Sequence, residues 1–314
     1  MIQMDVRPKP YFSSSASLES KQVCLGLAIL RPRQWIKNGF VFLGILLQLR
    51  FPSWSQIIQV IIGAILFCGM SSTIYIFNDL IDFEKDRIHP EKKKRPIATG
   101  QISKKVAISL MVVLGTITLI SGYFFNRNCG IILTIYVLVN IMYSLQLKEY
   151  IFIDLFCISV GFTLRVLLGF ILLGLPITEY KCLWFLLFIM FFTLFIGLGK
   201  RKSELIILST QSSSHRGSLK QYSLELISEV MPILITCTLI TYIMYTIESK
   251  NVMIVFSTVF LLYGILRYQY LYNNIYALGK PENIIFIDRP MRICILVWGF
   301  IYIGAAIERL IAGV

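Results

Sequence analysis

The sequence predicts an all-α integral membrane protein with nine transmembrane helices. Hydrophobic residues make up 56% of the 314-residue chain and charged residues only 15%, a balance that would leave a water-soluble domain of this size short of polar surface. Apolar runs of near-spanning length recur along the chain, and basic residues gather in alternate connections between them. We therefore expect a multi-pass helical bundle in the cell membrane.

Nine apolar segments follow a polar amino-terminal stretch. Residues 1–22 contain three consecutive serines and two prolines, and we expect them to form a flexible cytoplasmic tail. Each apolar segment approaches the roughly twenty residues that a helix needs to cross a bilayer, apart from a short first one. The expected spans are residues 38–50, 56–78, 105–125, 129–146, 151–174, 181–199, 226–247, 251–271 and 291–312.

The positions of the 30 lysines and arginines test this number and set the orientation. With the amino terminus in the cytoplasm, 24 of them fall on the cytoplasmic side, counting those at span ends, and Arg165 alone lies deep inside a span. The five on the opposite side are Arg50, Arg127, Lys181, Lys250 and Arg309. One missed or extra span would move every later connection to the other side of the membrane and would remove this asymmetry of basic residues. The asymmetry therefore supports nine spans and a carboxyl terminus outside the cell. Because the formal charge of +13 lies in membrane loops, nucleic-acid binding is disfavoured.

The first long cytoplasmic connection, residues 79–105, begins with an acidic cluster. Its three aspartates are separated by three and then four residues, so a continuing helix would place them on one face. Crowded carboxylates need a cation between them, and Mg²⁺ binds through one or two carboxylates while substrate phosphates complete its shell. The basic run Lys92–Arg95 would meet the remaining phosphate oxygens. The alternative is a solvated loop of mixed charge. The candidate metal ligands are Asn78, Asp79, Asp82 and Asp86.

Arg165 is a second candidate, because an arginine near the middle of a membrane costs about 2.5 kcal/mol or more unless it meets a partner or a polar cavity. Asp154 shares its helical face but lies about 16 Å away along the helix, too far for direct pairing. Two interpretations stay open. One is a structural partner on another helix, such as Tyr143 or a backbone carbonyl, and the other is contact with a phosphate group.

Several further motifs occur in a fixed order between residues 30 and 310. The acidic motif reads Asn78-Asp-Leu-Ile-Asp-Phe-Glu-Lys-Asp86, with Arg95-Pro-Ile-Ala-Thr-Gly100 shortly after it. The others are Arg31–Asn38, Asp86–Pro90, Tyr143–Lys148 with Asp154 and Arg165, Gly199–Glu204, and Pro281-Glu282 with Asp288-Arg289. In this order and spacing they resemble the UbiA superfamily of intramembrane prenyltransferases. Within it they are most similar to the polyprenyl-phosphate (decaprenyl-phosphate) phosphoribosyltransferases.

The resemblance implies a nine-helix bundle of UbiA type that forms one transmembrane prenyltransferase-like domain over residues 23–314. It implies a Mg²⁺-dependent transferase that moves 5-phosphoribosyl from phosphoribosyl pyrophosphate to a polyprenyl phosphate and releases pyrophosphate, with its active site on the cytoplasmic face. The catalytic residues it implies are Asp79, Asp82, Asp86, Lys37 and Arg95. The substrate-binding residues it implies are Asn38, Arg87, His89, Lys94, Tyr143, Lys148, Arg165, Lys200, Arg201, Glu204, Asp288 and Arg289.

The second cytoplasmic connection, residues 199–224, bears on the choice of donor. Relatives that use a prenyl pyrophosphate usually carry a second aspartate-rich motif there, whereas this chain has Lys200, Arg201 and Lys202 with only Glu204. This basic sequence in place of an acidic motif favours the binding of phosphate groups. The alternative is that these residues are only the basic cytoplasmic flank of a membrane span.

Two other functions are weighed. Prenyl transfer from prenyl pyrophosphate to an aromatic or quinone-precursor acceptor would share the first motif. A transporter is disfavoured by the odd number of spans and by the lack of a visible inverted repeat.

Overall fold

The computed structural model describes residues 26, 28–49, 51–88, 92–209, 219, 221–274 and 288–312, and their regular structure is entirely helical. The predicted tail, residues 1–22, lies outside this part of the chain.

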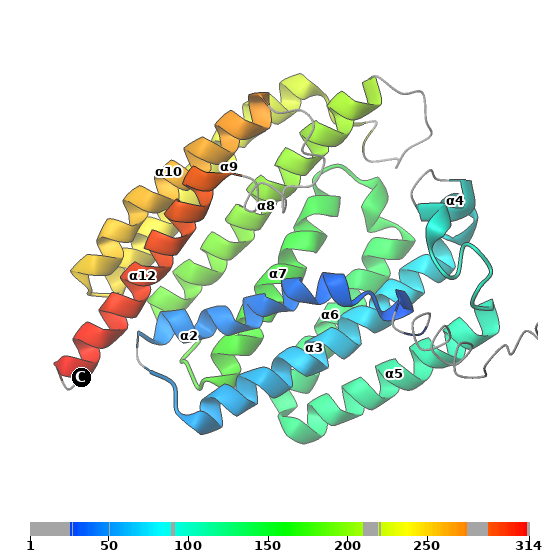
Figure 1. The fold of residues 1–314 in the computed structure, drawn as a ribbon, viewed down its shortest axis with the longest axis horizontal. Helices are drawn as coiled ribbons and strands as arrows, with labels where there is room; N and C mark the ends of the chain where they lie inside the picture. Colours follow the sequence, from blue (N-terminus) through cyan, green and yellow to red (C-terminus); the bar gives the residue numbers. More distant parts are fainter. Residues whose placement is uncertain are drawn as a thin grey trace, which may run out of the picture.

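Eight helices in the described ranges are long and apolar enough to cross a membrane (Figure 1). Each matches one of the predicted spans to within a few residues, except that α8 runs about ten residues further. They are α3 (Trp54–Ile81), α5 (Lys104–Phe125), α6 (Arg127–Leu145), α7 (Ile153–Leu172), α8 (Tyr180–Ser209), α9 (Leu224–Glu248), α10 (Val252–Asn274) and α12 (Arg289–Ile311). The short elements are η1 (Pro32–Phe42), α2 (Leu43–Gln48), α4 (Phe83–Ile88), η2 (Lys92–Lys94) and η3 (Leu147–Glu149).

The first predicted span, residues 38–50, has a different form. Here the chain makes the long 3₁₀ helix η1 and then the single turn and a half of α2, so the count of nine long helices is not confirmed. A 3₁₀ helix rises about 2.0 Å per residue against about 1.5 Å for an α-helix, so Pro32–Gln48 covers roughly 31 Å. That length is close to the thickness of a hydrocarbon core, about 30 Å, although α2 alone is far shorter than a spanning α-helix.

Helix α7 and the segment η1 approach each other at backbone distance. A Cβ built on Gly169 of α7 would lie 2.0 Å from the carbonyl oxygen of Val41 in η1, so only glycine permits this contact. Small residues serve this purpose in membrane bundles, where close packing replaces the hydrophobic effect. Residue 169 therefore fixes η1 against α7, while η1 also contacts α3.

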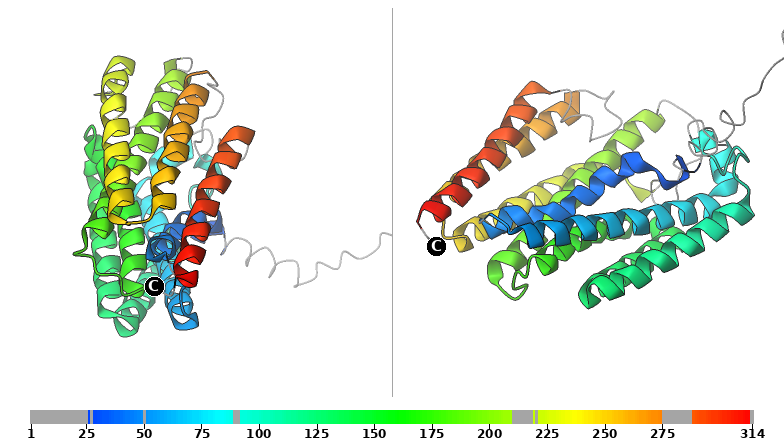
Figure 2. Two further views of the ribbon diagram at one scale, coloured as in Figure 1. Left: turned by 90° about the vertical axis from the view of Figure 1, so that its left-hand side faces the viewer. Right: turned by 60° about the horizontal axis from the view of Figure 1, so that its bottom comes forward.

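The remaining helices form two groups. Helices α3, α5 and α6 pack together beside α7, and α8 to α10 with α12 form the other side of the bundle (Figures 1 and 2). Because successive long helices run in opposite directions, several segment ends come together at the end of the bundle where α4 lies. These are the carboxyl ends of α3, α6, α8 and α10 and the amino ends of α5, α7, α9 and α12. This end carries the predicted site.

Candidate functional site

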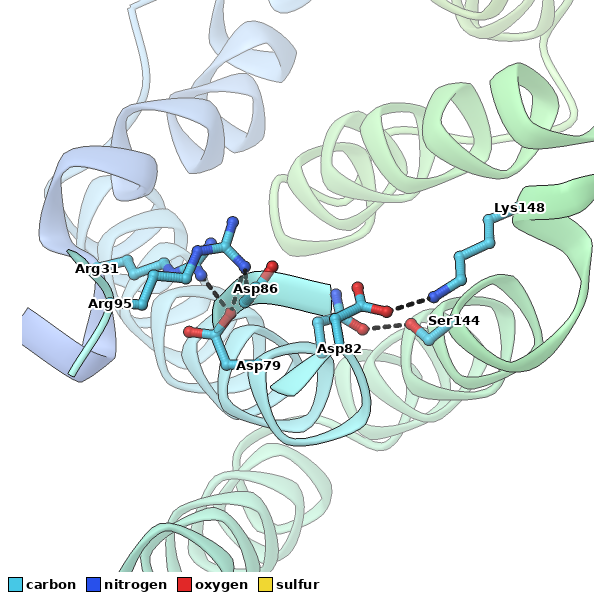
Figure 3. A network of polar contacts seen from close by, with 8 residues as sticks. Arg31, Asp79, Asp82, Asp86, Arg95, Ser144 and Lys148 are labelled. Carbon is cyan, nitrogen blue, oxygen red and sulfur yellow. Dashed lines mark hydrogen bonds and ion pairs between the residues drawn. The ribbon is translucent and has the colours of Figure 1, made fainter. Parts of the chain in front are cut away.

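The three aspartates of the first motif do not share one environment. Helix α3 ends at Ile81 with Asp82 as its C-cap, and α4 resumes at Phe83. This interruption turns Asp82 toward η3, while Asp79 and Asp86 meet on the other side (Figure 3). Asp79 of α3 and Asp86 of α4 both bind Arg95, whereas Asp82 at the helix end pairs with Lys148, so the three do not form the single carboxylate face that a continuous helix would give.

Asp79 and Asp86 belong to an arginine–aspartate cluster completed by Arg31 and Arg95. Nη1 of Arg95 donates to Oδ1 of Asp79 at 2.9 Å and to Oδ2 of Asp86 at 2.5 Å, and Nη2 of Arg31 donates to Oδ1 of Asp79. The two aspartates are 3% and 1% exposed. Two buried anions are thus balanced by two cations, the arrangement that makes a buried charge tolerable.

Arg31 is the member of this cluster that the sequence analysis did not assign. It precedes η1 with a backbone φ of 53°, in the left-handed region, and its guanidinium lies 5.3 Å from the centroid of the Tyr75 ring. It belongs to the motif Arg31–Asn38, but its partner lies 48 residues away in the chain. Only the fold reveals that contact.

Asp82 forms a second ion pair. Nζ of Lys148 in η3 donates to Oδ1 of Asp82 at 2.8 Å, and the Ser144 hydroxyl at the end of α6 donates to Oδ1 of Asn78 (Figure 3). Lys148 therefore lies in the site region that the motifs predict. Asn78, an expected metal ligand, uses its side-chain oxygen to join α3 to α6.

The aspartates suit a metal ion shared with a substrate better than a metal held by the protein alone. In the described part of the chain, no three acidic, histidine or cysteine side chains converge into a ready metal site. The ion pairs use one oxygen each of Asp79, Asp82 and Asp86, so every carboxylate keeps a second oxygen outside them. Hard oxygen donors of this kind, one or two at a time with phosphate oxygens beside them, match the preferences of Mg²⁺.

Asn38 and Arg165 meet in the interior of the bundle. Arg165 donates from Nε to Oδ1 of Asn38 at 2.8 Å, from Nη1 to the Gly161 carbonyl at 2.6 Å and from Nη2 to the Tyr136 hydroxyl at 3.2 Å. The carbonyl partner, that of Gly161, lies on the same helix α7 and not on another helix as expected, and the tyrosine partner is Tyr136 instead of Tyr143. Arg165 is only 5% exposed, and the partners of its guanidinium are neutral groups and aromatic rings.

Asn38 links three elements. Its amide nitrogen donates to Sγ of Cys68 and to the Ser71 hydroxyl, both on α3, while its oxygen accepts from Arg165 of α7. This buried side chain therefore holds η1 in register with two spans, a structural task that accompanies the substrate contact predicted for it.

Arg201 occupies a buried network instead of an open phosphate-binding loop. Its Nε and Nη2 atoms lie 3.0 and 2.9 Å from Oδ2 of Asp154, and its Nη1 donates to Oε2 of Glu204 at 2.7 Å. The Tyr222 hydroxyl donates to Oδ1 of Asp154 at 2.9 Å and accepts from the Phe152 amide. Burial raises the pKa of Tyr222 well above its ordinary value, with Asp154 contributing, so this hydroxyl stays protonated.

This network changes the interpretation of the second connection. Helix α8 continues to Ser209, so the expected loop begins as helix, and Arg201 is 2% exposed with its charge matched by Asp154 and Glu204. Arg201 therefore fastens α8 to α7 through Asp154, while Glu204 pairs with it within α8. Lys200 is exposed on the same helix.

Asp288 also has a structural partner set. It caps α12 by accepting from the Met291 amide at 2.8 Å, and Arg267 of α10 donates to both of its carboxylate oxygens, at 2.8 and 3.3 Å. The Arg267 guanidinium holds the pKa of Asp288 below its usual range. The side chain that was expected to bind substrate thus joins α10 to α12.

The other predicted residues differ in their exposure. Arg87 is exposed with its guanidinium 5.6 Å from the Phe83 ring, and Lys94 and Arg289 are exposed, while Lys37 and Tyr143 are half-buried. His89 lies outside the described residues.

Comparison with solved structures defines the class. The fold is similar to a UbiA homolog from Archaeoglobus fulgidus whose structure was determined bound to GPP and Mg²⁺, with a TM-score of 0.66 and 15% identity over 90% of this chain and 96% of that one. The chain is thus a UbiA-type intramembrane helical bundle.

It belongs to the UbiA prenyltransferase family, whose model matches residues 39–277. Two curated relatives, both called decaprenyl-phosphate phosphoribosyltransferase, align over 88% of the chain. The protein from Mycolicibacterium smegmatis is 30% identical with 91% of its own length covered, and that from Corynebacterium glutamicum is 30% identical with 85% covered.

Proposed function

We propose that this protein transfers 5-phosphoribosyl from phosphoribosyl pyrophosphate to a polyprenyl phosphate and releases pyrophosphate. The observation that carries the proposal is the near full-length similarity to relatives named for this activity. The cluster of Arg31, Asp79, Asp86 and Arg95 supports it, because this cluster offers both phosphate-binding cations and metal-binding carboxylates.

The chemistry requires little beyond positioning and charge stabilisation. The bond between the anomeric carbon and the pyrophosphate oxygen breaks, and a phosphate oxygen of the lipid bonds to that carbon. Because the acceptor is already an anion, no strong general base is needed. The leaving pyrophosphate gathers negative charge as the ribosyl centre becomes oxocarbenium-like, and preorganised cations stabilise that charge most effectively in a partly buried site.

In the part of the chain that the structure describes, the cations that pair with these aspartates are Arg31, Arg95 and Lys148. Their guanidinium and ammonium groups bind and orient the donor phosphates. The candidate holders of Mg²⁺ are the carboxylates of Asp79, Asp82 and Asp86. When bound, the ion supplies Lewis-acid stabilisation of the departing pyrophosphate. A single displacement inverts the configuration at the anomeric carbon.

The proposal includes an orientation. The basic connections support a site on the cytoplasmic face, where the water-soluble donor is available, with the acceptor's prenyl chain among the membrane helices. In this arrangement residues 1–22 form a cytoplasmic tail, and residues 23–314 form one domain. The combined segment η1 and α2 serves as the ninth span, and the carboxyl terminus lies outside.

The donor preference now depends less on the second connection than the sequence suggested. Asp154 and Glu204 neutralise Arg201, so this arginine is not available to a phosphate group. Lys200, by contrast, is exposed in the described part of that region. The preference for a phosphoribosyl donor therefore depends mainly on the relatives and on the arginine–aspartate cluster.

The test is transfer of label into the lipid phase. Purified protein with Mg²⁺, phosphoribosyl pyrophosphate labelled in the ribose and polyprenyl phosphate should give a labelled lipid. Asp79→Ala and Asp82→Ala should abolish transfer while the protein remains folded by size-exclusion chromatography. Lys104→Gln, which removes an exposed cation that lies 3.9 Å from Glu84, should retain it. Full turnover in both aspartate variants would remove the role proposed for these carboxylates.

A further inference from the structure

Arg31 and Arg95 occupy the carboxylates that the proposed reaction needs for a metal ion. Arg95 donates to both Asp79 and Asp86, and Arg31 donates to Asp79. The aspartate side chains are 3% and 2% exposed, whereas those of Arg31 and Arg95 are 23% and 25% exposed. The arginines therefore reach from the buried anions toward solvent, where a phosphate group can approach them.

The cluster is electrically balanced as it stands, with two charges of each sign. A divalent cation arriving alone would meet two guanidinium groups already placed on the carboxylates, and like charges in a partly buried site repel strongly. A metal ion that arrives with a diphosphate also brings anionic oxygens for the guanidinium groups. These groups bind phosphate with the same planar donor pattern that they use for carboxylates.

We propose that Arg31 and Arg95 exchange partners when the donor binds. The two arginines release the aspartates and bind the diphosphate, and the released aspartates bind the metal ion. Arg31 is thereby a further donor-binding residue. The exchange couples the two ligands, so that the metal ion and the diphosphate each bind weakly alone and tightly together. The inference rests on the proposed function only for the identity of the donor, because prenyl and phosphoribosyl donors both carry a diphosphate.

The backbone around Arg31 supports this role. Its φ of 53° is uncommon for a residue with a side chain, and such conformations concentrate at functional sites. The left-handed turn directs the guanidinium across the Tyr75 ring onto Asp79 immediately before η1 begins. Donor binding at Arg31 would therefore also act on η1, which carries Lys37 and Asn38.

The first arm of the test measures metal binding with no diphosphate present. Mn²⁺ replaces Mg²⁺ as the probe. It is titrated into the full-length protein in detergent, and electron paramagnetic resonance measures the concentration of free Mn²⁺. Wild type should bind Mn²⁺ weakly. Arg31→Gln and Arg95→Gln should bind it about tenfold more tightly, because each variant frees a buried carboxylate from a charge-assisted bond. Equal affinities in wild type and both variants would overturn the exchange.

The second arm measures retention of labelled inorganic pyrophosphate in the presence of Mg²⁺. Both glutamine variants should lose about tenfold in affinity. Arg31→Lys and Arg95→Lys keep the positive charge without the planar donor pattern, so they should bind Mn²⁺ as wild type does and still retain less pyrophosphate. These lysine variants also carry the test if a glutamine variant does not fold. Lys104→Gln is the matched control and should behave as wild type in both arms. Unchanged pyrophosphate retention in all four arginine variants would contradict the proposal.

The two arms stand apart from the transfer assay. If coupled binding is found but no labelled lipid forms from phosphoribosyl pyrophosphate, the exchange stands and the donor assignment fails. If labelled lipid forms and the arginine variants bind both probes as wild type does, the donor assignment stands and the exchange fails.

Discussion

Arg201→Gln separates a structural role from a substrate-binding role at the second connection. Arg201 is almost fully buried and contacts two carboxylates, of which Asp154 is 0% exposed. Removing one partner of a buried ion pair leaves the other charge uncompensated, at a cost of about 3–5 kcal/mol in unfolding free energy. Each kcal/mol lowers the melting temperature of a domain of about 150–250 residues by about 2–4 °C, so the expected decrease is on the order of 10 °C.

The assay is thermal unfolding in detergent, followed by the intrinsic tryptophan fluorescence. Below the unfolding range, we expect the KM for the donor to match wild type, because the guanidinium already pairs with Asp154 and Glu204. The double variant with Asp154→Asn should lose less stability than the sum of the single variants, since both charges are removed. Lys105→Gln, an exposed position on α5, is the control and should change stability by no more than about 0.5 kcal/mol. A wild-type melting temperature combined with a raised KM would refute the structural assignment.

Three further variants test the packing around the site by thermal unfolding. Gly169→Ala should cost about 1–3 kcal/mol because its Cβ would meet the backbone of η1, whereas Gly299→Ala, with nothing within 4 Å, should be neutral or stabilising. Asn38→Ala should cost about 1–3 kcal/mol because it leaves Nε of the buried Arg165 without its acceptor. Asp288 has a lowered pKa, so its contribution is full above the unfolded value, about 3.9, and is lost as pH falls through the folded value. Asp288→Asn should accordingly reduce the loss of stability below about pH 4, and an unchanged pH profile would exclude this contribution.

The spans were predictable because bilayer thickness sets a length that hydropathy records. Residues 105–125 were expected to form a span, and α5 covers Lys104–Phe125 with Ser103 as its N-cap. The η1 segment was not predictable in the same way. Hydropathy counts residues and carries no information on rise per residue, so it cannot distinguish a short α-helical run from a longer 3₁₀ segment.

The site was predictable where its residues are close in sequence. Asp79, Asp86 and Arg95 lie within seventeen residues and were expected to act together, and the structure joins them directly. Contacts between residues that lie far apart in the chain could not be predicted from one sequence. Arg31 reaches Asp79 across 48 positions, and Arg201 reaches Asp154 across 47, so neither contact leaves a local pattern.

Asp82 shows a different limit. Its spacing from Asp79 predicted a shared helical face, but the helix ends at this residue and the side chain turns to Lys148. No residue between Asp79 and Asp86 is a glycine or proline that would have marked the interruption. The local break leaves two of the three carboxylates on Arg95 and the third on Lys148.

The central claim is most directly tested by offering both donor classes to one preparation of the protein. The reaction would contain Mg²⁺, polyprenyl phosphate, an aromatic acceptor, phosphoribosyl pyrophosphate and a prenyl pyrophosphate, and mass spectrometry would identify the lipid products. We expect polyprenyl phosphate to gain the mass of one phosphoribosyl group, with pyrophosphate released in equal amount. A prenylated aromatic product, with polyprenyl phosphate left unchanged, would contradict the proposed function.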